Sequence, residues 1–255
     1  MGINELNINL GERILEINVI TYNIHHGKGI DKQVDLYRIA EVIDKSDADL
    51  VGLNEVDKHF SKRSLYEDQI SWLANQLNME HAFSPSISIK SKNSTKVRQY
   101  GNALLSRYPI VTKKSHSFNY IPGLVEGRSL LDVAIQINKQ LFQVNVTHLS
   151  LNPFLHKMQT DFIVSKHNKN PHPIIIMGDW NMRPGSRGWR KLTRSFQDAW
   201  YTEGIGAGHT YPSHRPRTRL DYIFVSQNVK VVEAKVLTNM SKASDHLPLT
   251  ARLLY

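Results

Sequence analysis

Six short polar clusters follow or interrupt apolar, strand-like segments of the chain: "YNIHHG", "VGLNEVD", "VTHLSLN", "MGDWNMRPGS", "RLDYIF" and "SDHLP". Buried strands that deliver polar side chains at their ends are one way in which α/β enzymes build a pocket. Asp and Asn also cap turns, but six such clusters are hard to explain as strand caps alone. The pattern therefore favours an enzyme whose site lies where several strands end.

Helix-like and strand-like segments alternate early in the chain, and strand-like segments follow one another more directly later. Leu36, Ile39 and Ile43 have helical spacing after Asp35, a suitable cap. Further helices are expected at 70–77 and 153–168, and strands at 16–24, 48–56, 102–106, 129–137, 141–149, 173–181, 220–225, 229–236 and 248–254. This order predicts a mixed-sheet α/β protein.

Two polar segments, 90–98 and 201–219, are rich in Ser, Lys, Gly, Arg and Pro and are expected to be long surface loops. Neither of them separates two halves that could each form a core. The chain has 255 residues, of which 40% are hydrophobic, so a substantial core is possible. We therefore expect a single catalytic domain over residues 1–255.

The composition excludes several kinds of chemistry. The chain has no cysteine, which excludes disulfides, thiolate catalysis and cysteine-ligated zinc. Its net charge of +9 favours anionic partners such as nucleic acid, phosphorylated metabolites or lipid headgroups, although a generally basic surface is the alternative. No transmembrane segment and no signal peptide are visible. We expect a cytoplasmic monomer, with secretion after removal of a leader as the alternative.

The polar clusters contain the groups that phosphate-ester hydrolysis needs. That reaction requires a cation near the phosphoryl oxygens, a group that orients and deprotonates water, and donors that hold the developing charge. Magnesium prefers one or two carboxylates and keeps several waters. The clusters offer four carboxylates, two histidines and two amides: Glu55, Asp179, Asp221 and Asp245; His148 and His246; Asn23 and Asn181.

Each of these residues also has a purely structural interpretation. Asp179 could cap the turn that follows it, but Asn181 lies two residues on and can share its face at strand spacing. His148 could be a satisfied core histidine, and Asn23 a strand-end amide. Asp221 is flanked by apolar residues, and a buried carboxylate there needs a partner such as His246.

The histidine doublet His25-His26 invites a metal-site interpretation. Adjacent strand residues point to opposite faces, so the two rings are not expected to share one ion while the strand persists. His25 can face the same side as Asn23 and is predicted to contact substrate at the pocket rim. His26, followed by Gly27, is expected to belong to the turn.

The strongly basic stretch "GHTYPSHRPRTR" precedes Asp221 in the sequence and is expected to open near the pocket. We predict that Arg215 and Arg217 in this stretch contact a second phosphate or an acidic arm of the substrate. A solvated basic loop without a ligand is the alternative.

Seven motifs occur along the chain in a specific order: "YNI", "LNEVD", "GNALLSRYPI", "THLSL", "GDWN", "LDYIF" and "SDHLP". In this ordered set the chain resembles the endonuclease/exonuclease/phosphatase superfamily, from about residue 16 to residue 254. The resemblance implies a four-layer α/β/β/α sandwich with two mixed β-sheets packed face to face and flanking helices. It also implies a Mg²⁺-dependent phosphoesterase, with Mn²⁺ possible, that uses an activated water.

The resemblance further implies a role for each site residue. Glu55 matches the principal metal ligand, Asp245 an acidic residue near the metal, and Asn23 a hydrogen-bonding partner at the metal site. The five residues that match the catalytic positions are His148, Asp179, Asn181, Asp221 and His246.

Among the catalytic positions, His246 matches the histidine that contacts the scissile phosphate or activates water, and Asp221 the carboxylate that orients it. Asp179 matches the residue that positions or deprotonates the water. His148 matches a phosphate clamp or leaving-group acid, and Asn181 a hydrogen-bonding partner of the phosphate. The division of acid and base roles between the histidines and Asp179 stays open.

The resemblance leaves the ester itself open. The segment after Asn23 lacks the beginning typical of apurinic endonucleases, and the lack of cysteine disfavours a disulfide-stabilised nuclease. We expect a phosphodiester or phosphomonoester that is small or lipid-linked. The alternative is a DNA endonuclease or exonuclease, which the net charge of +9 supports because backbone phosphates attract Lys and Arg. The intact site residues disfavour a non-enzymatic binding module.

Overall fold

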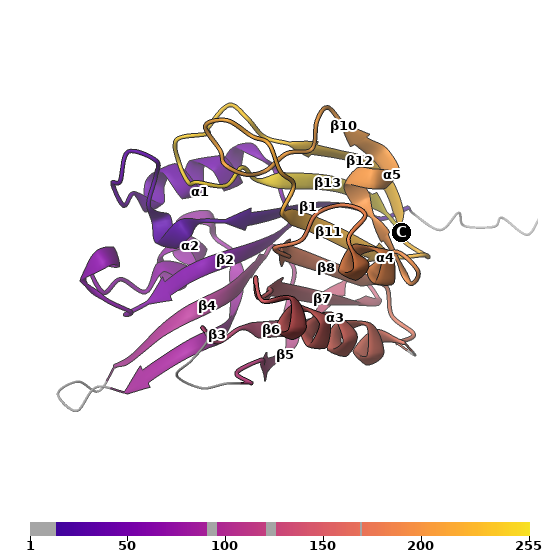
Figure 1. The fold of residues 1–255 in the computed structure, drawn as a ribbon, viewed down its shortest axis with the longest axis horizontal. Helices are drawn as coiled ribbons and strands as arrows, with labels where there is room; N and C mark the ends of the chain where they lie inside the picture. Colours follow the sequence, from indigo (N-terminus) through magenta and orange to yellow (C-terminus); the bar gives the residue numbers. More distant parts are fainter. Residues whose placement is uncertain (1–13, 91–95, 121–125, 169) are drawn as a thin grey trace, which may run out of the picture.

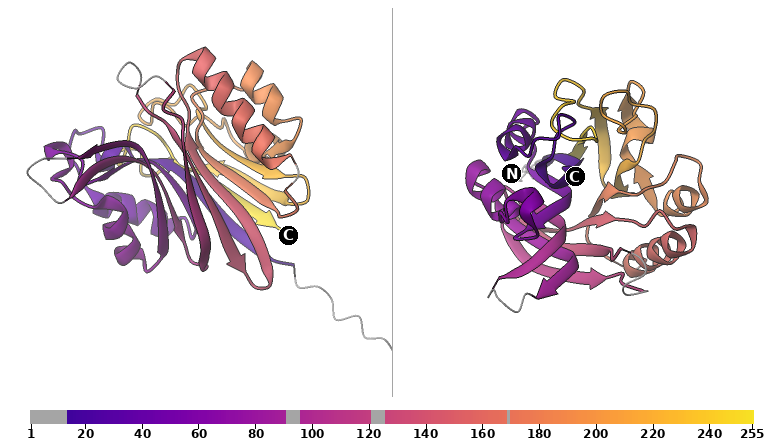
Figure 2. Two further views of the ribbon diagram at one scale, coloured as in Figure 1. Left: turned by 90° about the horizontal axis from the view of Figure 1, so that it is seen from below. Right: turned by 60° about the vertical axis from the view of Figure 1, so that its left-hand side comes forward.

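Two β-sheets form the centre of the molecule (Figure 1). The computed structural model describes residues 14–90, 96–120, 126–168 and 170–255. Within these residues one sheet has seven strands in the order β10-β12-β13-β1-β2-β4-β3, and the other has six in the order β5-β6-β7-β8-β11-β9. Both sheets mix parallel and antiparallel pairs. The sheets pack against each other and helices cover their outer faces (Figure 2). The predicted fold class is confirmed.

The strands and helices have the following bounds. The seven-stranded sheet contains β1 (Glu16–Asn23), β2 (Leu50–Lys58), β3 (Glu80–Lys90), β4 (Val97–Ser106), β10 (Gly204–Ile205), β12 (Lys230–Val236) and β13 (Leu249–Leu254). The six-stranded sheet contains β5 (Ile110–Ser117), β6 (Ser129–Ile137), β7 (Gln140–His148), β8 (Ile174–Asp179), β9 (Phe196–Asp198) and β11 (Asp221–Ser226). The helices are α1 (Leu36–Lys45), α2 (Gln69–Leu77), α3 (Pro153–His167), α4 (Arg187–Leu192) and α5 (Ala199–Glu203), with 3₁₀ turns η1 (His25–Gly27) and η2 (Lys62–Ser64).

The helices begin at capping residues and cover opposite sides of the sandwich. The side chain of Asp35 accepts a hydrogen bond from the backbone of Arg38 at the start of α1, as predicted. Asn152 caps α3 in the same way, ahead of Pro153 in its first turn. Apolar residues of α1 and α2 pack with β1 and β2, whereas those of α3 and α4 pack with β8 and β11.

The space between the sheets is a continuous apolar core. It joins residues of β1 and β2, such as Val19 and Leu50, to residues of the other sheet such as Val144 and Ile223. Burying each such side chain stabilises the fold by about 1.5–3 kcal/mol. At Gly52 the sheets approach so closely that an added Cβ would lie 3.0 Å from the Cβ of Met177. This close approach brings the strand ends of the two sheets to one place.

The structure corrects several sequence-based boundaries. Strands β3 and β5 and helix α4 were not predicted, and β4 begins at Val97 rather than at residue 102. The short strands β9 and β10 were missed as well. Strands β3 and β5 lie at a sheet edge and expose much of their length, so their Ser, Lys and His residues hide the alternating pattern.

The two expected loops also differ from the prediction. The segment 201–219 contains the end of α5 and all of β10, so it is only partly irregular. In the expected loop 90–98, residues 91–95 lie outside the described part of the chain, and Val97 and Arg98 belong to β4. The amino-terminal residues 1–13, where no signal peptide was visible, also lie outside it. Among the helices of the described residues, none is both long enough and apolar enough to cross a membrane.

Candidate active site

Strand register brings the predicted site residues to one end of the sandwich. His148 is the last residue of β7 and pairs with Asp179, the last residue of the parallel strand β8. Asp221 is the first residue of β11 and pairs with Asp179 from the antiparallel side. In the other sheet, Asn23 ends β1 beside Asn54 of the parallel strand β2. The register therefore delivers polar groups from four separate chain segments to one edge.

Asp221, His246 and Asp179 form a buried group whose metal-binding atoms lie within 4.8 Å of one another. His246 Nδ1 lies 2.8 Å from Asp221 Oδ2, and its Nε2 lies 3.7 Å from Asp179 Oδ2. Burial alone would lower the pKa of His246, but the carboxylates of Asp221, Asp179 and Asp245 outweigh it and raise the pKa to about 10. His246 is therefore an imidazolium at neutral pH.

The pKa of the Asp179 carboxyl group is set by opposing effects of its surroundings. Burial raises its pKa to about 7, and the nearby Asp221 adds to this, whereas the positive charge of His246 opposes it. Two donors also favour the carboxylate form: the backbone N–H of Asn181 donates to Asp179 Oδ1 at 3.0 Å, and Asn23 Nδ2 donates to Oδ2 at 3.1 Å. Near neutral pH this carboxyl group can therefore both accept and release a proton.

His148 has the opposite protonation to His246. Burial lowers its pKa well below the usual value, and the positive charges of Arg128 and His246 act in the same direction. Its Nε2 lies 3.1 Å from Asn181 Nδ2 and 3.5 Å from Asp179 Oδ2. Asn181 adopts a φ of 47° and also donates to the carbonyl of Leu149 at 3.0 Å, which fixes its amide beside the ring. The site thus contains one neutral and one charged histidine.

Glu55 reaches the same site from a bulge in β2. The pairing of β2 with β4 shifts register between Leu53 and Val56, and Glu55 has a φ of 60°. Its Oε1 accepts a hydrogen bond from Asn23 Nδ2 at 3.1 Å, so this one amide bridges Glu55 and Asp179. Asp245 lies at the more open side, with its Oδ1 3.6 Å from His25 Nδ1.

The histidine doublet departs from the strand-based expectation. β1 ends at Asn23, and His25 and His26 form a 3₁₀ turn with φ values of 45° and 47°. Their ring centroids lie 4.5 Å apart, and their metal-binding atoms lie within 4.8 Å of one another and of Glu55. The argument against a shared ion held only while the strand persists, and it does not apply here because strand alternation stops before the doublet. His26 does belong to a turn, as expected.

These donors fit a divalent cation on chemical grounds. Glu55 is half-buried, so its carboxylate can bind an ion that keeps several waters, as Mg²⁺ does. Asp221 Oδ1 is buried without a hydrogen-bond partner within the described residues, which leaves an acceptor for a cation or its water. The two imidazoles beside Glu55 are ligands that suit zinc, iron or nickel ions better than Mg²⁺.

Comparison with known proteins identifies the family. The sequence model of the endonuclease/exonuclease/phosphatase family matches residues 20–246. The chain belongs to this family. It is 23% identical to the uncharacterized protein YbhP of Escherichia coli K12 over 246 residues. This alignment covers 92% of this chain and 95% of YbhP.

Two solved structures share the fold of this chain. An endonuclease/exonuclease/phosphatase from Beutenbergia cavernae is 26% identical with a TM-score of 0.77, over 93% of this chain and 71% of that one. The mannosyl-6-phosphatase Bt3783 of Bacteroides thetaiotaomicron shares the fold at 17% identity and a TM-score of 0.74, over 94% of this chain and 100% of that one. Members of this family are hydrolases that act on phosphate esters.

Two buried amides of this family member were missed as site residues. Asn54 Oδ1 accepts a hydrogen bond from the backbone N–H of Asp179 at 2.8 Å, and its Nδ2 donates to the Thr147 carbonyl at 2.9 Å and to Asn102 Oδ1 at 2.8 Å. Asn102 in turn donates to the carbonyl of Ser129. This network joins the two sheets behind Asp179. The available signal was an amide within the apolar runs "VGLNEV" and "GNALLS", since a buried amide needs partners.

Further residues that were not predicted as site residues support the site. The ring of Tyr211 lies 4.8 Å from that of His246. Ser244 Oγ donates to the Asn23 carbonyl at 2.7 Å and thereby ties the segment before His246 to the end of β1. Arg128 NH1 lies 3.4 Å from His148 Nδ1 and also pairs with Glu126.

The two predicted arginines lie on the exposed loop before β11. Arg217 lines a cavity of about 510 Å³ together with Arg183, His209 and Arg219. Arg215 is exposed and does not line this cavity. A substrate contact of Arg215, Arg217 or His25 stays a prediction.

Proposed function

We propose that this chain is a Mg²⁺-dependent phosphoesterase that hydrolyses a phosphodiester or phosphomonoester of a small or lipid-linked substrate. The observation that carries the proposal is the charged His246 held between Asp221 and Asp179, with Glu55 joined to the same Asp179 through Asn23. A cation at Glu55 would neutralise phosphoryl oxygens and polarise the ester. Mn²⁺ could replace Mg²⁺ in this role.

The protein residues have separate tasks in this proposal. Asp179 holds the attacking water and takes its proton, because its raised pKa makes it a stronger base than an exposed carboxylate. His246 places a positive charge beside the developing phosphoryl charge, and Asp221 keeps its ring oriented. Asn181 donates to a phosphoryl oxygen, and the neutral His148 lies beside it on the same face.

Separate observations support a small phosphate ester and DNA as the substrate. The fold is shared with a protein named as a mannosyl-6-phosphatase, which supports a small phosphate ester. The net charge of +9 supports the second candidate, a DNA endonuclease or exonuclease. The single domain, the monomeric state and the cytoplasmic location stay predictions.

One panel of assays tests the proposal. The purified chain is incubated with Mg²⁺ or Mn²⁺ and with bis-p-nitrophenyl phosphate, p-nitrophenyl phosphate, sphingomyelin or plasmid DNA. We expect release of p-nitrophenol that is abolished by a chelator and by Glu55→Ala, but retained by Glu41→Ala on the exposed face of α1. Metal-dependent plasmid nicking with little turnover of the small esters would favour the nuclease. No turnover of any ester with either metal would contradict both.

A further inference from the structure

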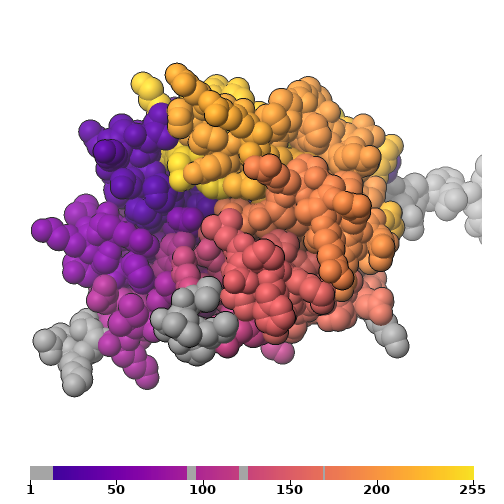
Figure 3. All heavy atoms as spheres, viewed as in Figure 1, coloured from indigo at the N-terminus to yellow at the C-terminus, as the bar shows by residue number. Residues whose placement is uncertain are grey.

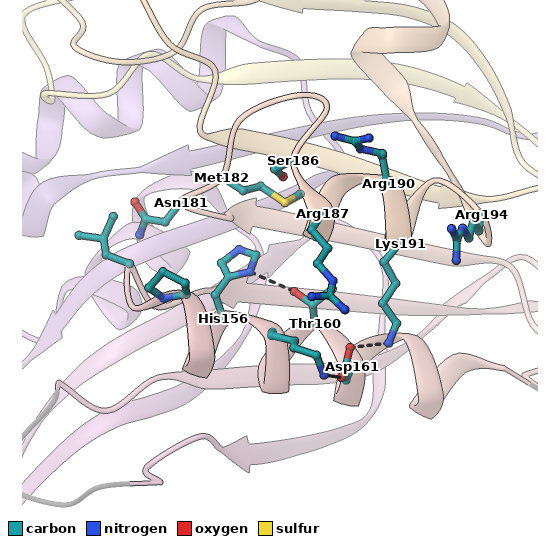
Figure 4. Close-up of a pocket in the computed structure, with 14 residues that line it drawn as sticks. His156, Thr160, Asp161, Asn181, Met182, Ser186, Arg187, Arg190, Lys191 and Arg194 are labelled. Carbon is teal, nitrogen blue, oxygen red and sulfur yellow. Dashed lines mark hydrogen bonds and ion pairs between the residues drawn. The ribbon is translucent and has the colours of Figure 1, made fainter.

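A groove of about 940 Å³ lies between α3 and α4 and begins at the candidate active site (Figure 4). The two helices contact each other, and their segments lie side by side on the surface (Figure 3). Asn181 lines one end of the groove, and its amide lies 3.1 Å from His148. The groove is therefore a direct continuation of the site.

Positive charge dominates the groove walls. Five lysine and arginine residues line it against a single carboxylate: Lys157, Arg187, Arg190, Lys191 and Arg194 against Asp161. Asp161 pairs with both Lys157 and Lys191, so it is already neutralised from two sides. Among the residues that the structure describes, the side chain of Arg190 donates only to the carbonyl of Gly185. The groove thus keeps an excess of cations.

Arg187 is the arginine best placed to meet a ligand. Figure 4 shows its side chain extending from α4 toward Thr160 on α3, in the middle of the groove. It is exposed and makes no hydrogen bond or ion pair with any residue that the structure describes. An arginine without a carboxylate partner retains its planar set of donors, whose geometry matches a phosphate.

The floor of the groove is fixed and uncharged. His156 Nε2 donates to the Trp180 carbonyl at 2.9 Å, and burial lowers the pKa of this ring. Gly188 lets α4 come close to it, because an added Cβ would lie 2.8 Å from His156 Cε1. Leu151 and Met182 add an apolar wall near Asn181. A ligand would therefore meet apolar surface near the active site and cations farther along.

We propose that this groove binds a second phosphate group on the same substrate molecule whose ester is hydrolysed beside Asn181 and Asp179. The proposal rests on the proposed phosphoesterase function and adds a substrate class to it: small molecules that carry two phosphates joined by an organic segment. The volume of about 940 Å³ accommodates such a molecule. Arg187 and Lys191 would hold the second phosphate, and the apolar wall would contact the segment between the two groups.

A pair of chromogenic esters tests this inference. Thymidine 5′-(p-nitrophenyl phosphate) and the same compound with an added 3′-phosphate carry the same scissile ester and differ only in the second phosphate. We expect the wild-type kcat/KM to be at least about tenfold higher for the bisphosphate, since a charge-assisted contact of this kind is typically strong enough for that. In Arg187→Gln the ratio of the two kcat/KM values should fall toward one.

The control is Lys230→Gln, which removes a positive charge at the other end of the sandwich. Lys230 pairs with Leu254 at the end of β13, far along that strand from the segment that carries His246. This variant should keep the wild-type ratio. An equal kcat/KM for the two esters in the wild-type protein, or an unchanged ratio in Arg187→Gln, would overturn the inference.

A binding measurement separates this inference from the proposed hydrolysis. Titration calorimetry of the full chain with thymidine 3′,5′-bisphosphate and with thymidine 5′-monophosphate needs no turnover. Tighter binding of the bisphosphate that is lost in Arg187→Gln would support the groove even if neither ester were hydrolysed. Equal affinity for the two nucleotides would reject the groove even if both esters were turned over.

Discussion

The two sides of the candidate active site differ in burial, and the difference separates their tasks. On one side, Asp179, Asp221 and His246 are each at most 6% exposed and hold one another in place. On the other side, the side chains of His25 and Asp245 are 32% and 38% exposed and lie 3.6 Å apart. Asp179 and Asp221 of the first side stand at strand ends, whereas the second side is formed by a bulge, a turn and the loop that also carries His246.

Burial fixes protonation states, and exposure leaves room for water. On the buried side, low dielectric strengthens the attraction between His246 and its carboxylates, so the imidazolium persists at neutral pH. On the exposed side a cation could keep the waters that Mg²⁺ retains. Mutations on the buried side should therefore change the chemical step, whereas those on the exposed side should change metal binding.

The largest effect is expected from Asp221→Asn. An amide cannot stabilise the imidazolium at 2.8 Å, so the pKa of His246 should fall. We expect kcat for bis-p-nitrophenyl phosphate to drop by roughly 10²–10⁴-fold with a much smaller change in the metal concentration for half-maximal rate. The control Asp44→Asn replaces an exposed carboxylate on α1. NMR titration of the His246 ring measures the pKa directly, and a kcat within threefold of wild type would refute the buried-side role.

Glu55→Gln should have the complementary effect. Because its carboxylate is half-buried and placed by a bulge, its loss should weaken metal binding by roughly 10–100-fold, while the fold stays intact. Calorimetric titration with Mn²⁺ measures this without turnover, and Glu41→Gln is the matched control. Unchanged Mn²⁺ affinity together with a large loss of kcat would place Glu55 with the buried residues and remove the contrast between the two sides.

Asn54→Ala tests whether the buried side depends on the link between the sheets. The change leaves the backbone N–H of Asp179 and the carbonyl of Thr147 without their partner. We expect the free energy of unfolding to fall by about 2 kcal/mol, because each buried group left unsatisfied is costly. Urea denaturation in chelator measures it, with Gln227→Ala, an exposed residue, as control. A change below the error of the control would show that water replaces the amide.

Sequence patterns predicted which residues form the site better than they predicted the backbone geometry of those residues. Strand ends and their polar residues are local features, so His148, Asp179 and Asp221 could be expected to meet. The positive φ of Glu55 and of the histidine doublet left no pattern, because both departures from strand geometry depend on neighbouring strands and turns.

Contacts between residues far apart in the chain could not be predicted from sequence patterns either. The bond between Asn54 and Asp179 joins residues 125 positions apart, which no local periodicity records. The groove was also missed, because α4 has only six residues and shows no amphipathic repeat that would mark it as a helix facing α3. Residues that act through tertiary contacts are therefore the part of this site that sequence patterns could not supply.

The pH dependence of stability gives the most specific test of the buried side. His246 has a folded-state pKa of about 10, above the value of about 6.5 expected in the unfolded chain. Its charged form therefore stabilises the fold fully below about pH 6.5, and this contribution is lost as the pH rises through about 10. His246 binds one proton, so its share of the free energy of unfolding should fall by at most about 1.4 kcal/mol per pH unit over that window. Urea denaturation in chelator at pH 6, 8 and 10 should show this slope in the wild-type protein and a flatter profile in His246→Gln. Parallel profiles would mean that the ring is neutral in the folded state, and the contrast between the two histidines would then disappear.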